Sequence, residues 1–126
     1  MKAKSIAGAA AASNLSWSVA VAHHSFAMFD LGKDVTVDAV VKEVQFTNPH
    51  VWLQIMVTDD KGVATEWSIE SGAPGMMLRN GWKPSTLKAG DRVKVTLHPL
   101  KNGNPGGSLV SVTVPDGRVL GAGAVN

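Results

Sequence analysis

From residue 35 onward, apolar and polar residues alternate along most of the chain, a pattern typical of strands with one face buried. In residues 50–58, every second residue from Val51 to Val57 is Val, Leu or Ile, so these side chains would share one face of a strand. The same pattern and the intervening turn residues predict five main strands and a short terminal one, at residues 35–46, 50–58, 63–70, 91–98, 108–114 and 118–120.

One short segment departs from this pattern. Residues 74–80 begin with Pro74 and are followed by Gly81, positions typical of the first turn and the end of a helix. We therefore predict one short helix between the third and fourth strands. Three strands, a helix and two further strands match the five-stranded Greek-key barrel known as the OB-fold, so we predict an all-β, OB-like barrel with little helix. A small β-sandwich is the alternative architecture.

The first 22 residues have a different character. Lys2 and Lys4 precede an Ala-rich apolar run, and Ala20-Val21-Ala22 carries small residues at both recognition positions of an export cleavage site. We predict that residues 1–22 are a signal peptide, that residues 23–126 form a single small β-barrel domain, and that the mature protein is periplasmic or secreted. The run is too short and too polar to predict a membrane span, so the mature chain is expected to lack one. An N-terminal extension of a cytoplasmic protein is the alternative.

Charge and composition narrow the range of functions. The chain has 12 Lys and Arg against 10 Asp and Glu, and removing Lys2 and Lys4 leaves 10 of each. Nucleic acid is therefore not an expected partner, because phosphate binding needs a clustered positive surface. Cys is absent, which excludes disulfides and thiolate metal ligands. No Ser lies in a Gly-x-Ser-x-Gly context, and we expect a protein that is not an enzyme.

Histidine offers the most specific chemistry in this sequence. Cleavage after Ala22 would make His23 the N-terminal residue, whose amine and imidazole can chelate one ion. An amine combined with imidazoles suits Cu(II), so the leading hypothesis is a periplasmic copper carrier or buffer. Its predicted metal ligands are His23, His24, His98 and His50.

Other interpretations of these residues remain open. His50 and His98 lie at predicted strand ends, where each could simply cap the strand through a backbone hydrogen bond. The alternative function is a metal-free OB-like binding module, in which Trp52 and Trp67 form a stacking platform for a small ligand, a peptide or a periplasmic partner protein. A copper oxidase built around the terminal amine is a third possibility.

Several short strings of this chain occur together: His23-His24-Ser25-Phe26, Thr47-Asn48-Pro49-His50, Glu66-Trp67-Ser68 and Leu97-His98-Pro99-Leu100. In this combination the chain resembles a family of small exported bacterial proteins known only as domain of unknown function 6152. The resemblance covers essentially the whole chain from residue 23 and implies an exported, mostly β protein, without implying an activity. A looser likeness is to the CopC-type periplasmic copper carriers, whose mature chain begins with a copper-binding histidine. His23 matches that feature, whereas the carriers' downstream Asp-x-His pattern is missing.

The OB topology adds an expectation about which histidines meet. The first strand pairs antiparallel with the fourth, so the start of the first lies beside the end of the fourth. We therefore expect His23 and His24 to lie nearer to His98 than to His50. On this basis His98→Ala would weaken Cu(II) binding more than His50→Ala.

We predict that the exported protein begins at His23, because the small residues of Ala20-Val21-Ala22 precede it. The intact mass of protein recovered from the periplasm measures the cleavage position directly. A mature form that retains Met1, or that starts beyond Ser25, would show that cleavage does not create a terminal His23.

Overall fold

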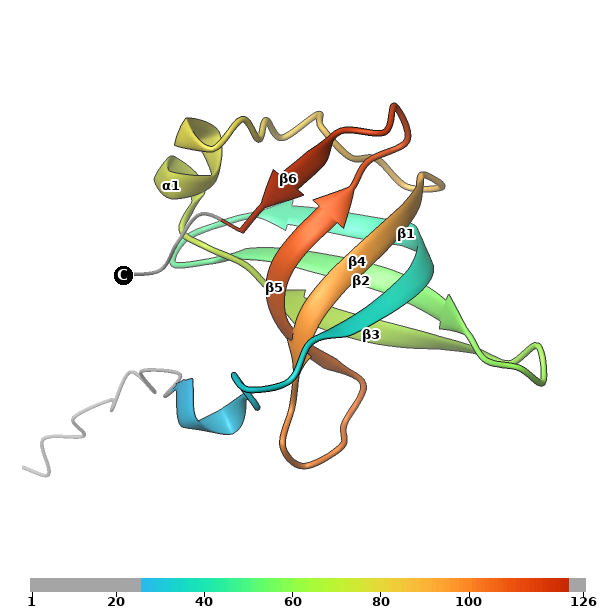
Figure 1. Ribbon diagram of the computed structural model, residues 1–126. Helices are drawn as coiled ribbons and strands as arrows, with labels where there is room; N and C mark the ends of the chain where they lie inside the picture. The colour runs from blue at the N-terminus through green and yellow to red at the C-terminus, as the bar shows by residue number, and fades with distance from the viewer. Residues whose placement is uncertain (1–25, 123–126) are drawn as a thin grey trace, which may run out of the picture.

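Within residues 26–122, six strands and one short α-helix follow one another in the predicted order (Figure 1). The computed structural model describes residues 26–122, so the predicted signal peptide, His23 and His24 lie outside the described residues. The elements are η1 (Phe26–Met28), β1 (Val35–Phe46), β2 (Val51–Thr58), β3 (Ala64–Glu70), α1 (Pro74–Arg79), β4 (Arg92–Pro99), β5 (Gly106–Thr113) and β6 (Val119–Gly121).

Five of the strands close into a barrel. Their order is β3-β2-β1-β4-β5, and a parallel pairing between β3 and β5 completes the ring, while β6 adds to β5 outside it. The other pairings are antiparallel. This is the connectivity of an OB-like barrel, so the predicted fold and the short helix between the third and fourth strands are confirmed.

β1 belongs to both halves of the barrel because it bends. Its first half pairs with β4 and its second half with β2, and Val40 faces a partner on each side. The register shifts between Val41 and Glu43, which marks a β-bulge. A bulge bends and twists a strand, and this allows one strand of 12 residues to curve around the barrel.

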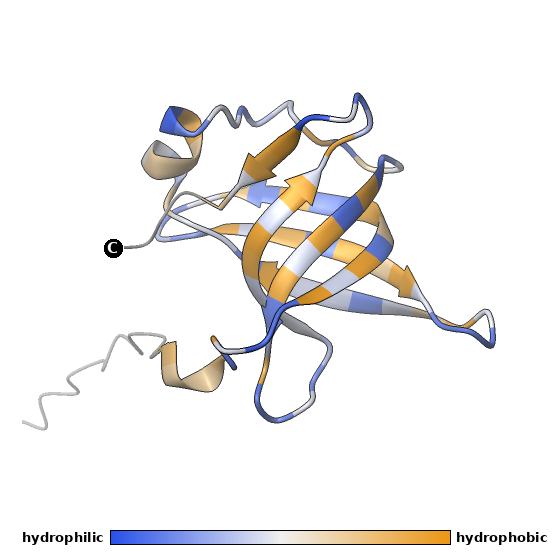
Figure 2. Ribbon diagram, in the orientation of Figure 1, coloured by the Kyte–Doolittle hydropathy of each residue, from blue (hydrophilic) through white to orange (hydrophobic). Residues whose placement is uncertain are grey.

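The alternation predicted for β2 forms part of the barrel interior. Val51, Leu53 and Ile55 are at most 1% exposed and pack with Ile69, Leu97 and other apolar residues. Figure 2 shows the resulting bands of apolar and polar residues along the strands. Trp82, which follows α1, is also buried, and its indole N–H donates a hydrogen bond of 2.8 Å to the backbone oxygen of Gly121.

The start of β5 differs from the prediction. The strand begins at Gly106 rather than Ser108, because Gly106 and Gly107 pair with Ser68 and Ile69 and so close the barrel. A Cβ atom on Gly106 would collide with the backbone oxygen of Ser68, and one on Gly107 with the backbone oxygen of His98. Gly106 and Gly107 look like the end of a loop in the sequence. In the structure, their lack of side chains allows β5 to pack closely against the backbones of β3 and β4. The other strand boundaries agree with the prediction to within one residue.

Within residues 26–122, no helix has the length and apolar character needed to cross a membrane.

We predict that Gly107→Ala lowers the free energy of unfolding by roughly 2 kcal/mol, because the added methyl group would overlap the backbone of β4. Urea-induced unfolding measures this change. Gly121→Ala on β6 is the matched control, since its Cβ would lie 3.9 Å from the backbone oxygen of Val110, an ordinary van der Waals contact. Equal stability of the two variants would show that the close contact between Gly107 and the backbone of β4 does not limit stability.

Candidate functional site

A row of side chains crosses the outer face of the barrel where β3 meets β5. Trp52 pairs with Glu70, Glu70 pairs with Ser108, and Ser108 pairs with His98. Because paired residues point to the same face of a sheet, these four side chains form a line across β2, β3, β5 and β4. Asp34 extends the line before β1, where its Oδ1 lies 3.1 Å from Nδ1 of His98.

The N-terminal segment of the described chain is fixed beside the end of β4. Phe29 forms a β-bridge with Leu100, and the amide of Asp30 donates a 2.9 Å hydrogen bond to the backbone oxygen of Pro99. Met28 accepts a 3.0 Å hydrogen bond from the amide of Lys101. Phe29 is only 6% exposed, so this segment is anchored by its side chain as well as its backbone.

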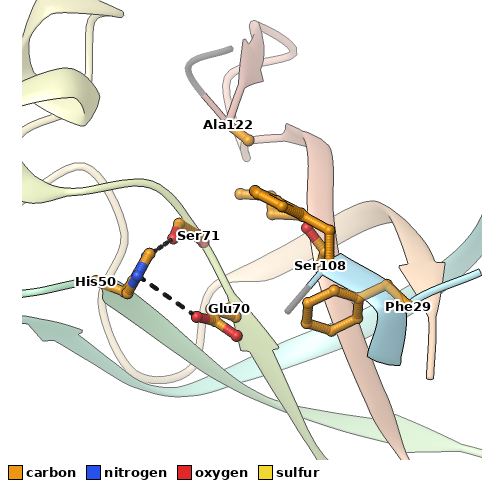
Figure 3. A pocket seen from close by; sticks show the side chains of 8 residues that line it. Phe29, His50, Glu70, Ser71, Ser108 and Ala122 are labelled. Atoms are coloured by element: carbon orange, nitrogen blue, oxygen red, sulfur yellow. Dashed lines mark hydrogen bonds and ion pairs between the residues drawn. The ribbon is translucent and has the colours of Figure 1, made fainter. Parts of the chain in front are cut away.

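A small cavity of about 40 Å³ lies between this segment and the barrel (Figure 3). The N-terminal segment supplies Phe26 and Phe29, whereas the junctions flanking β2 and β3 supply His50, Glu70 and Ser71. The remaining lining residues are Ser108, Leu109 and Ala122. The cavity therefore combines aromatic walls with an imidazole, a carboxylate and two hydroxyl groups.

His50 and Glu70 face each other in this cavity (Figure 3). Nδ1 of His50 lies 3.0 Å from the backbone oxygen of Ser71, and a carbonyl can only accept, so Nδ1 carries the hydrogen. In the neutral ring this leaves the lone pair on Nε2, which lies 3.7 Å from Oε1 of Glu70. Two electron-rich atoms then face each other, and either a proton on Nε2 or a cation between them makes the arrangement favourable.

Burial makes this pair unusual. The side chain of Glu70 is 8% exposed and that of His50 is 34% exposed. A buried carboxylate is unfavourable unless a positive group or hydrogen-bond donors compensate it. His50 is the positive partner that lies within ion-pair distance of this carboxylate, at 3.7 Å.

Ser71 contributes a buried hydroxyl next to this cavity. The residue is 6% exposed, and its Oγ is the buried side-chain polar atom that lacks a hydrogen-bond partner in residues 26–122. Leaving a buried hydroxyl without a partner costs about 1–3 kcal/mol.

His98 lies beside the cavity without lining it. Its Nδ1 is 3.0 Å from the backbone oxygen of Lys33 and 3.1 Å from Asp34, and its side chain is 24% exposed. His50 and His98 therefore both make the backbone contacts expected of strand-end caps. Such a contact also orients Nε2 toward another ligand, because metal-binding histidines usually donate their second ring N–H to a carbonyl or carboxylate.

The described residues alone do not form a complete metal centre. In the range 26–122, no three His, Cys, Asp or Glu side chains gather closely enough to hold an ion. His50 with Glu70, and His98 with Asp34, are separate pairs. The predicted ligands His23 and His24 lie outside the described residues, so a metal site in this protein requires a ligand from that part of the chain or from solvent.

Phe26 is the first described residue of the N-terminal segment. The backbone passes the end of β4, as the OB topology predicts, and Phe26 lines the cavity that His50 also lines. His23 is three residues before Phe26, a separation of at most about 10 Å in an extended chain. The expectation that His23 and His24 lie nearer to His98 than to His50 falls on residues outside those that the structure describes. The strand order positions the segment's backbone but does not specify which way its side chains face.

The tryptophan platform considered for the alternative function does not form. Trp52 pairs with Glu70 on the outer face of the barrel, whereas Trp67 pairs with Ile55 and packs against the core. Trp52 lines a second crevice of about 110 Å³ with Met28 and other residues, and Trp67 lines a different hollow. The two rings therefore cannot stack on one ligand.

Of the polar residues that line this cavity, His50 was expected from the sequence, whereas Glu70, Ser71 and Ser108 were not. Glu70 could have been noticed as a carboxylate at the end of an alternating strand. Its burial and its pairing with Ser108, however, depend on the parallel contact between β3 and β5, which no local pattern specifies.

The fold and the site define a small OB-like barrel with a capped, partly polar cavity on its outer face. The chain matches the DUF6152 family, a family of unknown function, over residues 11–109, and it therefore belongs to that family. The resemblance drawn from its short sequence strings is confirmed, whereas a likeness to the CopC-type carriers is not shown. Comparison with curated proteins and with solved structures finds no match.

We predict that Glu70→Gln raises the free energy of unfolding of the metal-free protein by about 1 kcal/mol, because it replaces a buried charge with a neutral group of the same shape. Urea unfolding at neutral pH measures the change. Glu43→Gln on the exposed face of β1 is the control and should lie within about 0.5 kcal/mol of the wild type. A clear loss of stability in Glu70→Gln would show that the carboxylate stabilises the fold.

Proposed function

We propose that this protein is exported and binds Cu(II) as a carrier or buffer, with a site formed by His23, His50 and Glu70. The proposal rests mainly on the cavity in which Nε2 of His50 and Oε1 of Glu70 lie 3.7 Å apart. Phe26 lines the same cavity as His50 and Glu70. His23 is only three residues before Phe26 in the sequence.

The spacing of the two atoms suits one ion. Bonds from transition metals to imidazole nitrogen and carboxylate oxygen are about 2.0–2.2 Å long, so an ion between two atoms 3.7 Å apart can reach both. The terminal amine and imidazole of a processed His23 would complete a set of three nitrogens and one oxygen. Nitrogen and oxygen ligands of this kind favour Cu(II), and thiolate ligands are absent because the chain has no Cys.

The size of the cavity supports binding of an ion rather than conversion of an organic substrate. Sites for organic ligands commonly measure 300–1,000 Å³. The cavity beside His50 measures about 40 Å³. We therefore assign carriage or buffering, and give His24 and His98 secondary roles next to the site.

A metal-free binding module is the alternative function. The apolar crevice next to the cavity supports it, since Met28, Trp52, Leu100 and Pro105 line a space of about 110 Å³ that would accept one apolar side chain of a partner protein. In this case Glu70, which also lines the crevice, would contact the partner instead of a metal.

We predict that His50→Ala and Glu70→Gln each weaken Cu(II) binding at least about tenfold, whereas His98→Ala weakens it less than about threefold. An extra N-terminal methionine should also weaken binding, because it removes the amine from the chelate ring of His23. Calorimetric titration of protein processed in the periplasm measures all five forms, including the wild type.

The matched pair of histidine variants distinguishes the two neighbouring His–carboxylate pairs. A larger loss in His98→Ala would restore the order expected from the strand topology. Equal affinity of all five forms would remove the terminal-histidine site and leave the metal-free module as the better account.

A further inference from the structure

The first half of β3 has an edge that no strand of the barrel covers. Its pairing with β5 ends at Ser68, which faces Gly106, whereas its pairing with β2 continues to Ala64. The chain before Gly106 turns away into the β4–β5 loop (Figure 1). Within residues 26–122, the stretch from Ala64 to Trp67 therefore has a strand on one side only. We call this stretch the free edge of β3.

The free edge presents backbone groups with which a further strand can pair. The amide of Ser68 points away from β2, since it donates a hydrogen bond of 3.5 Å to the backbone oxygen of Pro105. The N–H and C=O groups of every second residue of a strand point to the same side. The backbone groups of Glu66 and Ala64 therefore face the open side. The register with β2 is regular here and the stretch contains no Pro, so neither a bulge nor a proline blocks the edge.

A groove of about 370 Å³ lies between the free edge and the β4–β5 loop. On the hairpin side it is lined by Val57, Thr65 and Trp67, whose side chains share one face of the sheet. The loop side supplies Pro99, Leu100, Gly103, Asn104 and Pro105. A strand paired with the free edge would turn every second side chain into this groove. An apolar side chain opposite Trp67 would thus be covered by mainly apolar residues.

Asp59 gives the groove its charge. It is the one charged residue in the groove lining, and its Oδ1 accepts hydrogen bonds of 2.9 Å from the amides of Lys61 and Val63. In the described part of the chain, no Lys, Arg or His forms an ion pair with Asp59. The backbone of Asp59 bonds to Val63, four residues before Trp67. A basic side chain four positions from the apolar one would therefore complement this carboxylate.

We infer that the free edge of β3 binds an extended segment of a partner protein, which adds a strand to the sheet. The segment carries an apolar residue that packs against Trp67 and, four positions away, a Lys or Arg that pairs with Asp59. Backbone hydrogen bonds to Ala64 and Glu66 hold the segment, and the two side chains make binding selective. The groove shares no lining residue with the cavity beside His50, so this inference does not depend on the proposed metal site.

A random library of eight-residue peptides, selected on the processed protein without added metal, tests the inference. We expect the selected peptides to share an apolar residue and a Lys or Arg four positions apart. The strongest of them, synthesised with a fluorescent label, then serves as the probe peptide, and fluorescence anisotropy measures its affinity. Binding of the probe peptide should slow hydrogen exchange at the amides of Ala64 and Glu66, because these amides become hydrogen-bonded.

A pair of variants at one position separates backbone pairing from side-chain contact. Glu66→Pro removes an amide that faces the open side and leaves the bonds to β2 in place, so it should weaken binding of the probe peptide at least about tenfold. Glu66→Ala is the matched control. It also loses the 2.8 Å contact with Lys42 but keeps the amide, and it should bind within about twofold of the wild type. Circular dichroism checks that both variants keep the barrel.

Asp59→Asn tests the charge without removing the turn's hydrogen-bond acceptor. It should weaken binding of the basic probe peptide roughly two- to fivefold, as expected for an exposed ion pair. Asp60→Asn, which lies outside the groove lining, is the matched control and should bind like the wild type.

A library that yields no binding peptide would overturn the inference, as would equal affinity of Glu66→Pro and Glu66→Ala or unchanged hydrogen exchange at Ala64 and Glu66. Selected peptides without Lys or Arg would overturn the role of Asp59. A wild type that dimerises in analytical ultracentrifugation, while Glu66→Pro stays monomeric, would show that a second copy of this chain occupies the edge in place of a partner segment.

Discussion

The parallel contact between β3 and β5 is the constraint on which the rest of this structure depends. It is only three residue pairs long, from Ser68 with Gly106 to Glu70 with Ser108. The contact closes the barrel and at the same time places a carboxylate from one hairpin beside a hydroxyl from another. Gly106 and Gly107 make the approach possible, because side chains at these positions would meet the neighbouring backbones. Closure therefore also adds Ser108 to the cavity, whereas the β2–β3 hairpin brings His50 and Glu70 together.

The local elements of this fold were predictable because they depend on local patterns. Alternation identified the strands, and Pro74 and Gly81 marked the short helix. The start of β5 was not predictable in this way, because glycines favour loops in general and their role here comes from close contact with β3 and β4. The same limit applies to the site, where Glu70 and Ser108 are far apart in sequence and become neighbours only through closure.

The tryptophans show how strictly register controls such predictions. Trp52 and Trp67 lie on adjacent strands of one hairpin, yet they occupy opposite faces because the turn at Asp59–Gly62 pairs Trp52 with Glu70. A register shifted by one residue would have put both rings on one face. Residue type and strand assignment were therefore insufficient to predict a shared surface.

The histidines illustrate that a structural and a functional role need not compete. In both His50 and His98, Nδ1 contacts a backbone oxygen, which is the plain capping role expected at a strand end. In His50, that contact leaves Nε2 as the ring atom that faces Glu70. The segment from Phe29 to Val35 has a comparable double constraint, since Phe29 is bridged to Leu100 and Val35 is paired with Leu97. Both ends of this segment are therefore paired with the same part of the chain, from Leu97 to Leu100. The turn between β2 and β3, by contrast, projects away from the barrel (Figure 1). In evolutionary terms, insertions and deletions should accumulate in that turn, while the length of the Phe29–Val35 segment should be inherited almost unchanged.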